Sequence, residues 1–173
     1  MIVTSGMLNQ TFKNFEIVCI NDGCTDNTVS IVQTYTDPRI RIINQANRGL
    51  AAARNTGINA SRGTFIALLD SDDFWRSDKL KQHFEHLCSD STLGVSYSAS
   101  SFVDDNNSVL GIGQYPQLTD IHPALILCRN PVGNGSSAVI RKLALTQVAF
   151  RQLINGEKRK SYFDETLHQS EDI

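Results

Sequence analysis

The first half of the chain alternates short apolar runs with helix-forming segments, and this alternation constrains the fold more than any other feature. Apolar runs at 15–21, 40–44 and 64–70 predict buried strands. The segments between them, 25–35 and 50–60, predict helices, because the first opens with a Thr-Asp-Asn-Thr capping region and the second is rich in alanine. This βαβαβ order predicts an α/β domain with a mostly parallel sheet flanked by helices.

The second half predicts a more mixed arrangement. A helix is expected at 77–88, where apolar side chains recur at i, i+4, i+7 and i+8. The polar and basic residues at 152–161 predict an exposed loop. The other expected elements are a hairpin of strands 95–103 and 108–112, short helices at 121–128 and 143–150, and a strand at 136–140.

Composition excludes several classes of protein. The length of 173 residues suits one domain, and 40% hydrophobic with 20% charged residues excludes an intrinsically disordered chain. Lys and Arg (16) do not outnumber Asp and Glu (18), which excludes a strongly basic nucleic-acid-binding protein. No stretch approaches about 18 consecutive apolar residues, so no membrane span is expected. The four cysteines form no CxxC pair and predict a reducing compartment.

Two of the predicted strands end in carboxylates, at Asp22 and at Asp70-Ser71-Asp72. Ligands of parallel α/β sheets bind beyond the carboxyl ends of the strands. If strand geometry persists through Asp72, the two carboxylates of this DxD pattern share a side and repel by roughly 4 kcal/mol at 4 Å and an effective dielectric of 20. Mg²⁺, Mn²⁺ or Ca²⁺ would remove that repulsion. The alternative is a solvated acidic turn before the next helix, with Asp73 at the helix start.

Three other groups are candidates for ligand contacts. Asp22 precedes Gly23 in a tight turn, where its carboxylate could accept hydrogen bonds from a base or ribose or could only cap the turn. Arg54 could reach a diphosphate through its paired donors or could be a surface arginine. Asp172, next to Glu171, could act as a general base or be solvated charge. His83 and His86 have i, i+3 spacing, for which exposed histidines are the favoured interpretation over metal ligands.

Taken in order, five segments resemble the motifs of family 2 glycosyltransferases, which have the GT-A nucleotide-sugar-binding fold. The order and the spacing of the segments make the resemblance specific, and they extend over nearly the whole chain. The segments are LNQTFKNFEIV at 8–18, NDGCTDNT at 21–28, NRGLAAARNTG at 47–57, FIALLDSDD at 65–73, and YFDETL at 162–167 followed by Glu171-Asp172.

The resemblance implies a role for each matching residue. Asp22 would contact the nucleobase, Arg54 would lie near the nucleotide, and Asp70 would contact the ribose or the metal shell. Asp72 would ligate Mn²⁺ or Mg²⁺ at the donor diphosphate. Asp172 would deprotonate the acceptor hydroxyl in an inverting displacement, while the metal offsets the charge of the leaving diphosphate.

The chain also departs from the family pattern. Asn21 replaces the first Asp of the DDG motif, and we expect this to be tolerated because Asp22 remains. The family begins with an apolar strand that residues 1–5 do not supply, and it continues with a helix after the Glu-Asp pair. We therefore expect residues 1–173 to be one catalytic domain truncated at both ends, without the N-terminal strand and the C-terminal helix. Residues 1–104 would be the nucleotide-sugar-binding half and 105–173 the acceptor-side half.

The expected activity is a metal-dependent, inverting transfer of a sugar from a nucleotide-diphosphate donor, with a UDP-sugar as the favoured donor. The expected acceptor is a glycan or a lipid-linked glycan of the cell surface, and the expected location is the cytoplasm, including the inner face of the membrane. The alternative is a non-catalytic fragment that binds a nucleotide or a partner. A nucleotidyl- or phosphoryl-transfer enzyme is disfavoured, because no glycine-rich phosphate loop is present.

Overall fold

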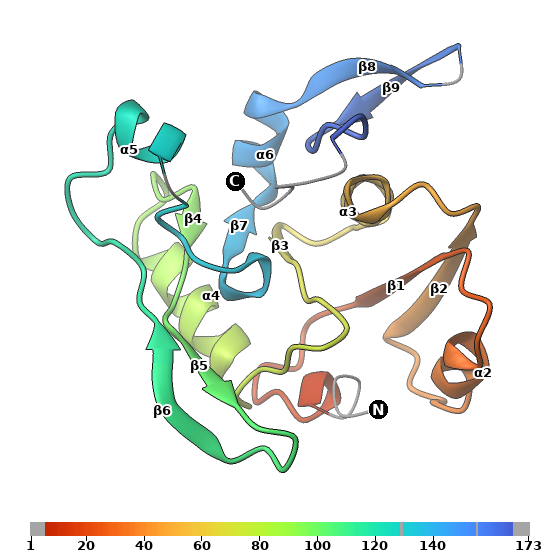
Figure 1. Cartoon of the computed structure of the whole chain (residues 1–173), viewed down its shortest axis with the longest axis horizontal. Helices are drawn as coiled ribbons and strands as arrows, with labels where there is room; N and C mark the ends of the chain where they lie inside the picture. The colour runs from red at the N-terminus through yellow and green to blue at the C-terminus, as the bar shows by residue number, and fades with distance from the viewer. Residues whose placement is uncertain (1–5, 129, 155, 168–173) are drawn as a thin grey trace.

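A computed structural model describes residues 6–128, 130–154 and 156–167 (Figure 1). Most of the predicted elements are present, several with shorter bounds. In chain order they are β1 (Ile17–Asp22), α2 (Thr28–Gln33), β2 (Ile40–Gln45), α3 (Leu50–Ala60), β3 (Phe65–Ala67), α4 (Lys79–Ser89), β4 (Val95–Ser96), β5 (Ser100–Val103), β6 (Val109–Gln114), α5 (Pro123–Cys128), the 3₁₀ turn η1 (Gly135–Ser137), β7 (Val139–Arg141), α6 (Lys142–Val148), β8 (Phe150–Ile154) and β9 (Glu157–Ser161).

The first βαβ unit forms as predicted. Strands β1 and β2 pair in parallel from Ile17 opposite Ile40 to Asp22 opposite Gln45, so both strands end at the same edge. Helix α3 packs on β1, where a Cβ on Gly57 would lie 3.6 Å from the side chain of Ile20. The N–H of Gly49, at the N-terminal end of α3, donates to Asp22 at the end of β1 (2.8 Å), so the helix begins beside the end of the strand.

The expectation of one mostly parallel sheet is wrong. The described residues form four small sheets, in which β3 pairs with β7 in antiparallel fashion and β4 pairs with the other edge of β7. Strand β3 ends after three residues, and the backbone beyond it leaves the ladder. There the Asp70 N–H donates to the hydroxyl of Ser136 (3.0 Å) in place of a strand carbonyl.

The polar segment 152–161 is a hairpin and not the predicted loop. Strands β8 and β9 pair from Phe150 opposite Ser161 to Ile154 opposite Glu157, and Gly156 at the turn has φ of +83°. Strand β9 has no apolar alternation, so its conformation depends on backbone hydrogen bonds to β8, which a local pattern does not reveal. The predicted strand 95–103 also divides, into β4 and β5, and β5 forms the expected hairpin with β6.

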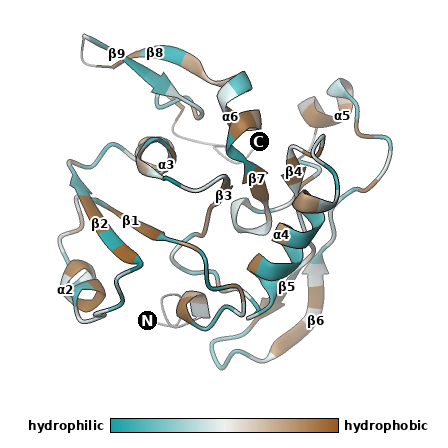
Figure 2. Cartoon of the chain, turned by 180° about the vertical axis from the view of Figure 1, so that it is seen from behind, coloured by the Kyte–Doolittle hydropathy of each residue, from teal (hydrophilic) through white to brown (hydrophobic). Residues whose placement is uncertain are grey.

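The hydrophobic core lies where α3, β3 and α6 meet. Ile58, Ile66 and Leu145 are buried together, and Tyr162 and Phe163 pack against them from the segment after β9. Figure 2 shows β1 and β7 as largely apolar strands, with β3 between α3 and β7. The core therefore joins residues from both halves of the chain around α3.

A polar network holds α4 against β4. His83 is 5% exposed, so the prediction of an exposed histidine is wrong for this residue. Its Nε2 lies 3.0 Å from Nζ of Lys79, and its Nδ1 lies 2.7 Å from Oγ of Ser96, which is also 2.8 Å from Nδ1 of His86. Burial lowers the pKa of Lys79 to about 8, and burial together with the charges of Lys79 and His86 lowers the pKa of His83 to about 4. His83 is therefore neutral near pH 7 and accepts a hydrogen bond from Lys79.

This depressed pKa of His83 makes the stability of the fold sensitive to acid. Between pH 6.5 and pH 4 the unfolded chain protonates this imidazole and the folded chain does not, so acidification favours unfolding. We expect the free energy of unfolding to fall by about 3 kcal/mol across this range. Urea denaturation at several pH values should show this slope, and His83→Gln should flatten it. His122→Gln, at an exposed histidine, is the control; equal slopes in both variants would contradict the assignment.

Candidate functional site

Asp22 holds the loop between β2 and α3. Its carboxylate accepts hydrogen bonds from Nε2 of Gln45 (2.6 Å) and from the backbone N–H groups of Arg48 (3.0 Å) and Gly49 (2.8 Å). The next residue, Gly23, has φ of +75°, and a Cβ there would lie 2.9 Å from the backbone N of Asn47, so only glycine fits. Asp22 is thus more than a cap of its own turn, because it joins the ends of both parallel strands to the start of α3.

The replacement of the first Asp of the DDG motif by Asn21 has a local explanation. Oδ1 of Asn21 accepts the N–H of Cys24 (2.9 Å), and its Nδ2 donates to Oδ1 of Asn44 on β2 (2.9 Å). The amide therefore supplies one acceptor to the turn and one donor to the neighbouring strand. An aspartate would supply only acceptors, so the bond that Asn21 donates to Asn44 would be lost.

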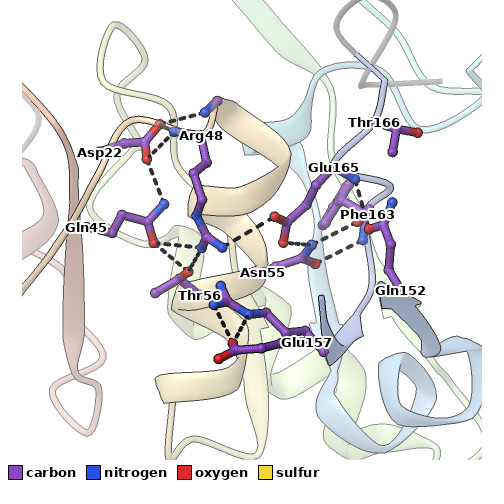
Figure 3. Close-up of polar contacts among 12 residues, drawn as sticks. Asp22, Gln45, Arg48, Asn55, Thr56, Gln152, Glu157, Phe163, Glu165 and Thr166 are labelled. Carbon is purple, nitrogen blue, oxygen red and sulfur yellow. Dashed lines mark hydrogen bonds and ion pairs between the residues drawn. The ribbon is translucent and has the colours of Figure 1, made fainter. Parts of the chain in front are cut away.

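Arg48 connects this edge to the segment after β9 (Figure 3). Its guanidinium contacts Oε1 of Gln45 (3.4 Å) and Oγ1 of Thr56 (3.3 Å), and lies 3.6 Å from a carboxylate oxygen of Glu165, whose side chain is 8% exposed. Thr56 in turn donates to Gln45 (2.6 Å). A cavity of about 420 Å³ opens beside this network. Its lining includes polar and apolar groups of β2, Arg48, α3, β9 and Glu165.

Arg54 forms a buried ion pair with Asp70. The arginine is 6% exposed, and its Nη2 lies 3.2 Å from both carboxylate oxygens of Asp70, whose side chain is 31% exposed. The guanidinium also lies over the ring of Phe163, 5.5 Å from its centroid. Arg54 is therefore not the surface residue of the alternative interpretation, and it orients the acid that ends the β3 segment.

The acidic loop after β3 is held by a segment more than 60 residues away. Ser136 accepts the N–H of Asp70 on its hydroxyl and the indole N–H of Trp75 on its carbonyl (2.9 Å), and Asn134 donates to Asp73 (3.4 Å). Nζ of Lys79 donates to the carbonyl of the adjacent Ser137 (2.7 Å). These hydrogen bonds hold the acidic loop at both of its ends, so η1 and the residue before it fix the position of the loop.

Asp72 lies on this loop with its side chain exposed, and within the described ranges its carboxylate accepts no hydrogen bond and joins no ion pair. Asp73 donates its N–H to the carbonyl of Asp70 (3.2 Å), so the backbone turns here and the predicted extended DxD geometry is wrong. No cluster of three or more potential ligand side chains occurs in the part of the chain that the structure describes. A single free carboxylate suits Mg²⁺ or Mn²⁺ held mainly through substrate phosphates, a mode that needs one or two protein carboxylates.

Asn55 links α3 to the segment 162–165. It is 3% exposed; its Oδ1 accepts the N–H groups of Tyr162 (2.8 Å) and Phe163 (3.0 Å), and its Nδ2 donates to the carbonyl of Phe163 (2.8 Å) and to Glu165 (3.0 Å). All four hydrogen-bonding positions of the amide are used. This side chain therefore sets the place of the segment that leads toward Asp172.

The structure brings together some of the predicted site residues. Arg54 and Asp70 are in contact, and Asp22 reaches the same helix at its first turn; Asp172 lies outside the described residues. Sequence reasoning missed the organising roles of Asn55 and Glu165. Both lie within the matched motifs at 47–57 and 162–167, but their contact spans 110 residues and no local pattern reveals it.

These features define a mixed α/β domain with acidic and basic side chains gathered around the ends of its first strands and the start of α3. The chain belongs to glycosyl transferase family 2, because its sequence matches that family over residues 3–148.

No helix among the described residues is both long enough and apolar enough to cross a membrane.

Individual relatives agree with this assignment. The Escherichia coli UDP-Glc:alpha-D-GlcNAc-diphosphoundecaprenol beta-1,3-glucosyltransferase WfgD is 33% identical over 126 residues, which are 72% of this chain and 49% of that protein. Escherichia coli chondroitin synthase is 34% identical over 108 residues, 61% of this chain and 16% of that protein. The chain spans less than half of the length of the curated relatives it matches.

Solved structures show the same fold. A crystal structure of TarS residues 1–349 from S. aureus, in complex with UDP, superposes with a TM-score of 0.68 at 20% identity and covers 99% of this chain and 48% of that one. A second TarS structure, in complex with UDP-GlcNAc, superposes with a TM-score of 0.61 over 84% of this chain and 42% of that one. The GT-A-like α/β fold is therefore confirmed, with the small sheets described above.

The contacts of Asn55 yield a direct test. Asn55→Ala leaves the N–H groups of Tyr162 and Phe163 and the carboxylate of Glu165 without their partner, so we expect a loss of about 2–4 kcal/mol in the free energy of unfolding. Asn59→Ala, one turn further along α3, removes a single exposed hydrogen bond to the Lys160 carbonyl and should cost less than about 1 kcal/mol. Urea denaturation measures both; equal losses would refute the special role of Asn55.

Proposed function

We propose that this chain carries the catalytic domain of an inverting, metal-dependent glycosyltransferase that moves a sugar from a nucleotide-diphosphate donor to an acceptor hydroxyl. The observation that carries the proposal is the buried Arg54–Asp70 pair, because it orients the acidic loop and leaves Asp72 exposed and unpaired within the described residues. Membership of the family and the TarS complexes with UDP and UDP-GlcNAc support a UDP-sugar as the donor.

Each of the acidic residues near the donor would have its own role in binding. Asp22, held by the backbone N–H groups of Arg48 and Gly49, would contact the nucleobase. Asp70, held by Arg54, would contact the ribose or the metal shell. Asp72 would hold Mn²⁺ or Mg²⁺ against the diphosphate. That cation would offset the negative charge that develops on the leaving nucleoside diphosphate.

Sugar transfer also needs a base on the opposite side of the anomeric carbon. We assign this role to Asp172, whose carboxylate would take the proton of the acceptor hydroxyl. The acceptor oxygen then forms a bond to the anomeric carbon while the bond from that carbon to the diphosphate oxygen breaks. Attack from the side opposite the leaving group inverts the anomeric configuration. Asn55 and Glu165 would orient the segment that precedes this base.

The names of the relatives support a particular class of acceptor molecule. WfgD is named for transfer to GlcNAc-diphosphoundecaprenol and other relatives for chondroitin and hyaluronan synthesis, which supports a glycan or a lipid-linked glycan of the cell surface. We propose that the protein acts in cell-surface polysaccharide synthesis at the cytoplasmic side of the membrane. Residues 1–104 would supply the donor half and residues 105–173 the acceptor half of one domain.

Substitution of the acids tests the proposal. With Mn²⁺ and UDP-sugars, release of UDP should fall by about 10²–10³ in Asp72→Ala and by about 10²–10⁴ in Asp172→Asn. Asp105→Asn, at an exposed acid of the β5–β6 turn, should keep full activity. Full activity in both site variants would refute the assignment of the residues.

Calorimetry separates the enzyme from the non-catalytic alternative. A catalytic domain should bind UDP more tightly with Mn²⁺ than without it, Asp72→Ala should abolish that difference, and the wild-type chain should release UDP from the donor. Metal-linked binding of UDP with no turnover in the wild-type chain would instead support a nucleotide-binding fragment.

A further inference from the structure

The outer side of the β8–β9 hairpin carries three cations and no acid. Arg151 lies opposite Lys160, and Leu153 lies opposite Lys158. Because opposite residues and alternate residues of paired strands share a face, these four exposed side chains form one surface, which we call the basic hairpin face. Like charges directly opposite each other destabilise a strand pair, so an anion against this face would stabilise it.

The same three cations line one concavity. A cavity of about 460 Å³ lies between the C-terminal part of α6 and the hairpin, and its lining includes Arg151, Lys158 and Lys160 but no carboxylate. In the ranges that the structure describes, none of the three forms an ion pair. Nζ of Lys160 lies over the ring of Tyr162, 5.3 Å from its centroid, which anchors one of the charges. Positive charge is thus concentrated here without neutralisation.

The opposite face of the hairpin differs. Arg159 pairs there with Glu157 (2.8 Å), and Gln152 contacts the segment after β9 through Asp164 and the N–H of Glu165. That face contacts the body of the domain through Gln152, and the Arg159–Glu157 pair on it is exposed. The whole chain has a formal net charge of −2, so the basic hairpin face is a local concentration of charge and not part of a general excess.

An exposed aliphatic side chain lies among the cations. Leu153, opposite Lys158 in the basic hairpin face, is 66% exposed. Figure 2 shows β9 as hydrophilic and the adjoining end of β8 as mixed. Basic residues interleaved with exposed aliphatic ones are typical of surfaces that lie on anionic lipid, because cations meet the phosphates while aliphatic groups enter the headgroup region.

We propose that the basic hairpin face docks on an anionic membrane surface. The phosphate groups of phospholipids lie against Arg151, Lys158 and Lys160, and Leu153 enters the headgroup layer. The inference deepens the membrane location of the proposed function by naming the surface that docks. Docking requires neither a donor nor transfer of sugar, so its test is independent of activity.

Vesicle sedimentation tests the docking. The chain should bind vesicles of phosphatidylglycerol and phosphatidylcholine but not phosphatidylcholine alone, and binding should weaken with added salt because the charges are screened. Arg151→Gln/Lys158→Gln/Lys160→Gln should partition on the order of 100-fold more weakly. The variant should remain folded, since it removes repulsion between exposed side chains, and circular dichroism checks this.

A control variant matches the change in charge. Arg62→Gln/Arg76→Gln/Lys81→Gln also removes three exposed cations, but outside the hairpin, and should bind the mixed vesicles within about twofold of the wild-type chain. Equal loss in both triple variants, or no binding of the wild-type chain to anionic vesicles, would overturn the proposal. Calorimetric binding of inorganic phosphate without binding of vesicles would also overturn it, in favour of a soluble phosphorylated ligand.

Discussion

The buried ion pair between Arg54 and Asp70 is the interaction on which the rest of the site depends. A guanidinium that is 6% exposed must be compensated by a carboxylate, and this requirement ties α3 to the acidic loop after β3. The adjacent Asn55 uses its whole amide to hold the segment 162–165. Two consecutive residues of one helix therefore connect the loop proposed to hold the metal with the segment proposed to lead to the base.

The supports of this site come from distant parts of the chain, and each satisfies a buried polar group. Ser136 accepts the Asp70 N–H that no neighbouring strand accepts, and Lys79 holds η1 from the other side. The network of Lys79 with His83 and Ser96 links this support to α4 and β4, and burial lowers the pKa values of Lys79 and His83 there. The acidic loop is thus positioned by tertiary contacts and not by extension of strand β3.

The β8–β9 hairpin has two faces with different roles. Gln152 on one face contacts the segment that Asn55 holds, and Arg151, Leu153, Lys158 and Lys160 lie on the other face, where Lys160 also reaches the ring of Tyr162. Docking of that outer face on lipid would bring the acceptor-side half of the domain to the membrane. A lipid-linked acceptor of the kind named for WfgD would then meet the site at the surface where it resides. The membrane proposal and the transfer proposal are therefore compatible, although each has its own test.

The sequence alone determined the family, the βαβ unit and the candidate residues. Motifs and apolar runs are local patterns, so they and their order can be recognised without knowledge of the tertiary structure. The helix predicted at 50–60 has the bounds of α3, and Arg54 was a candidate before its partner was known. Only the tertiary structure decided that β3 pairs with β7, that 152–161 is a hairpin and that His83 is buried. These outcomes depend on hydrogen bonds and packing between segments far apart in the chain, where the free energy of satisfying buried polar groups outweighs local preference.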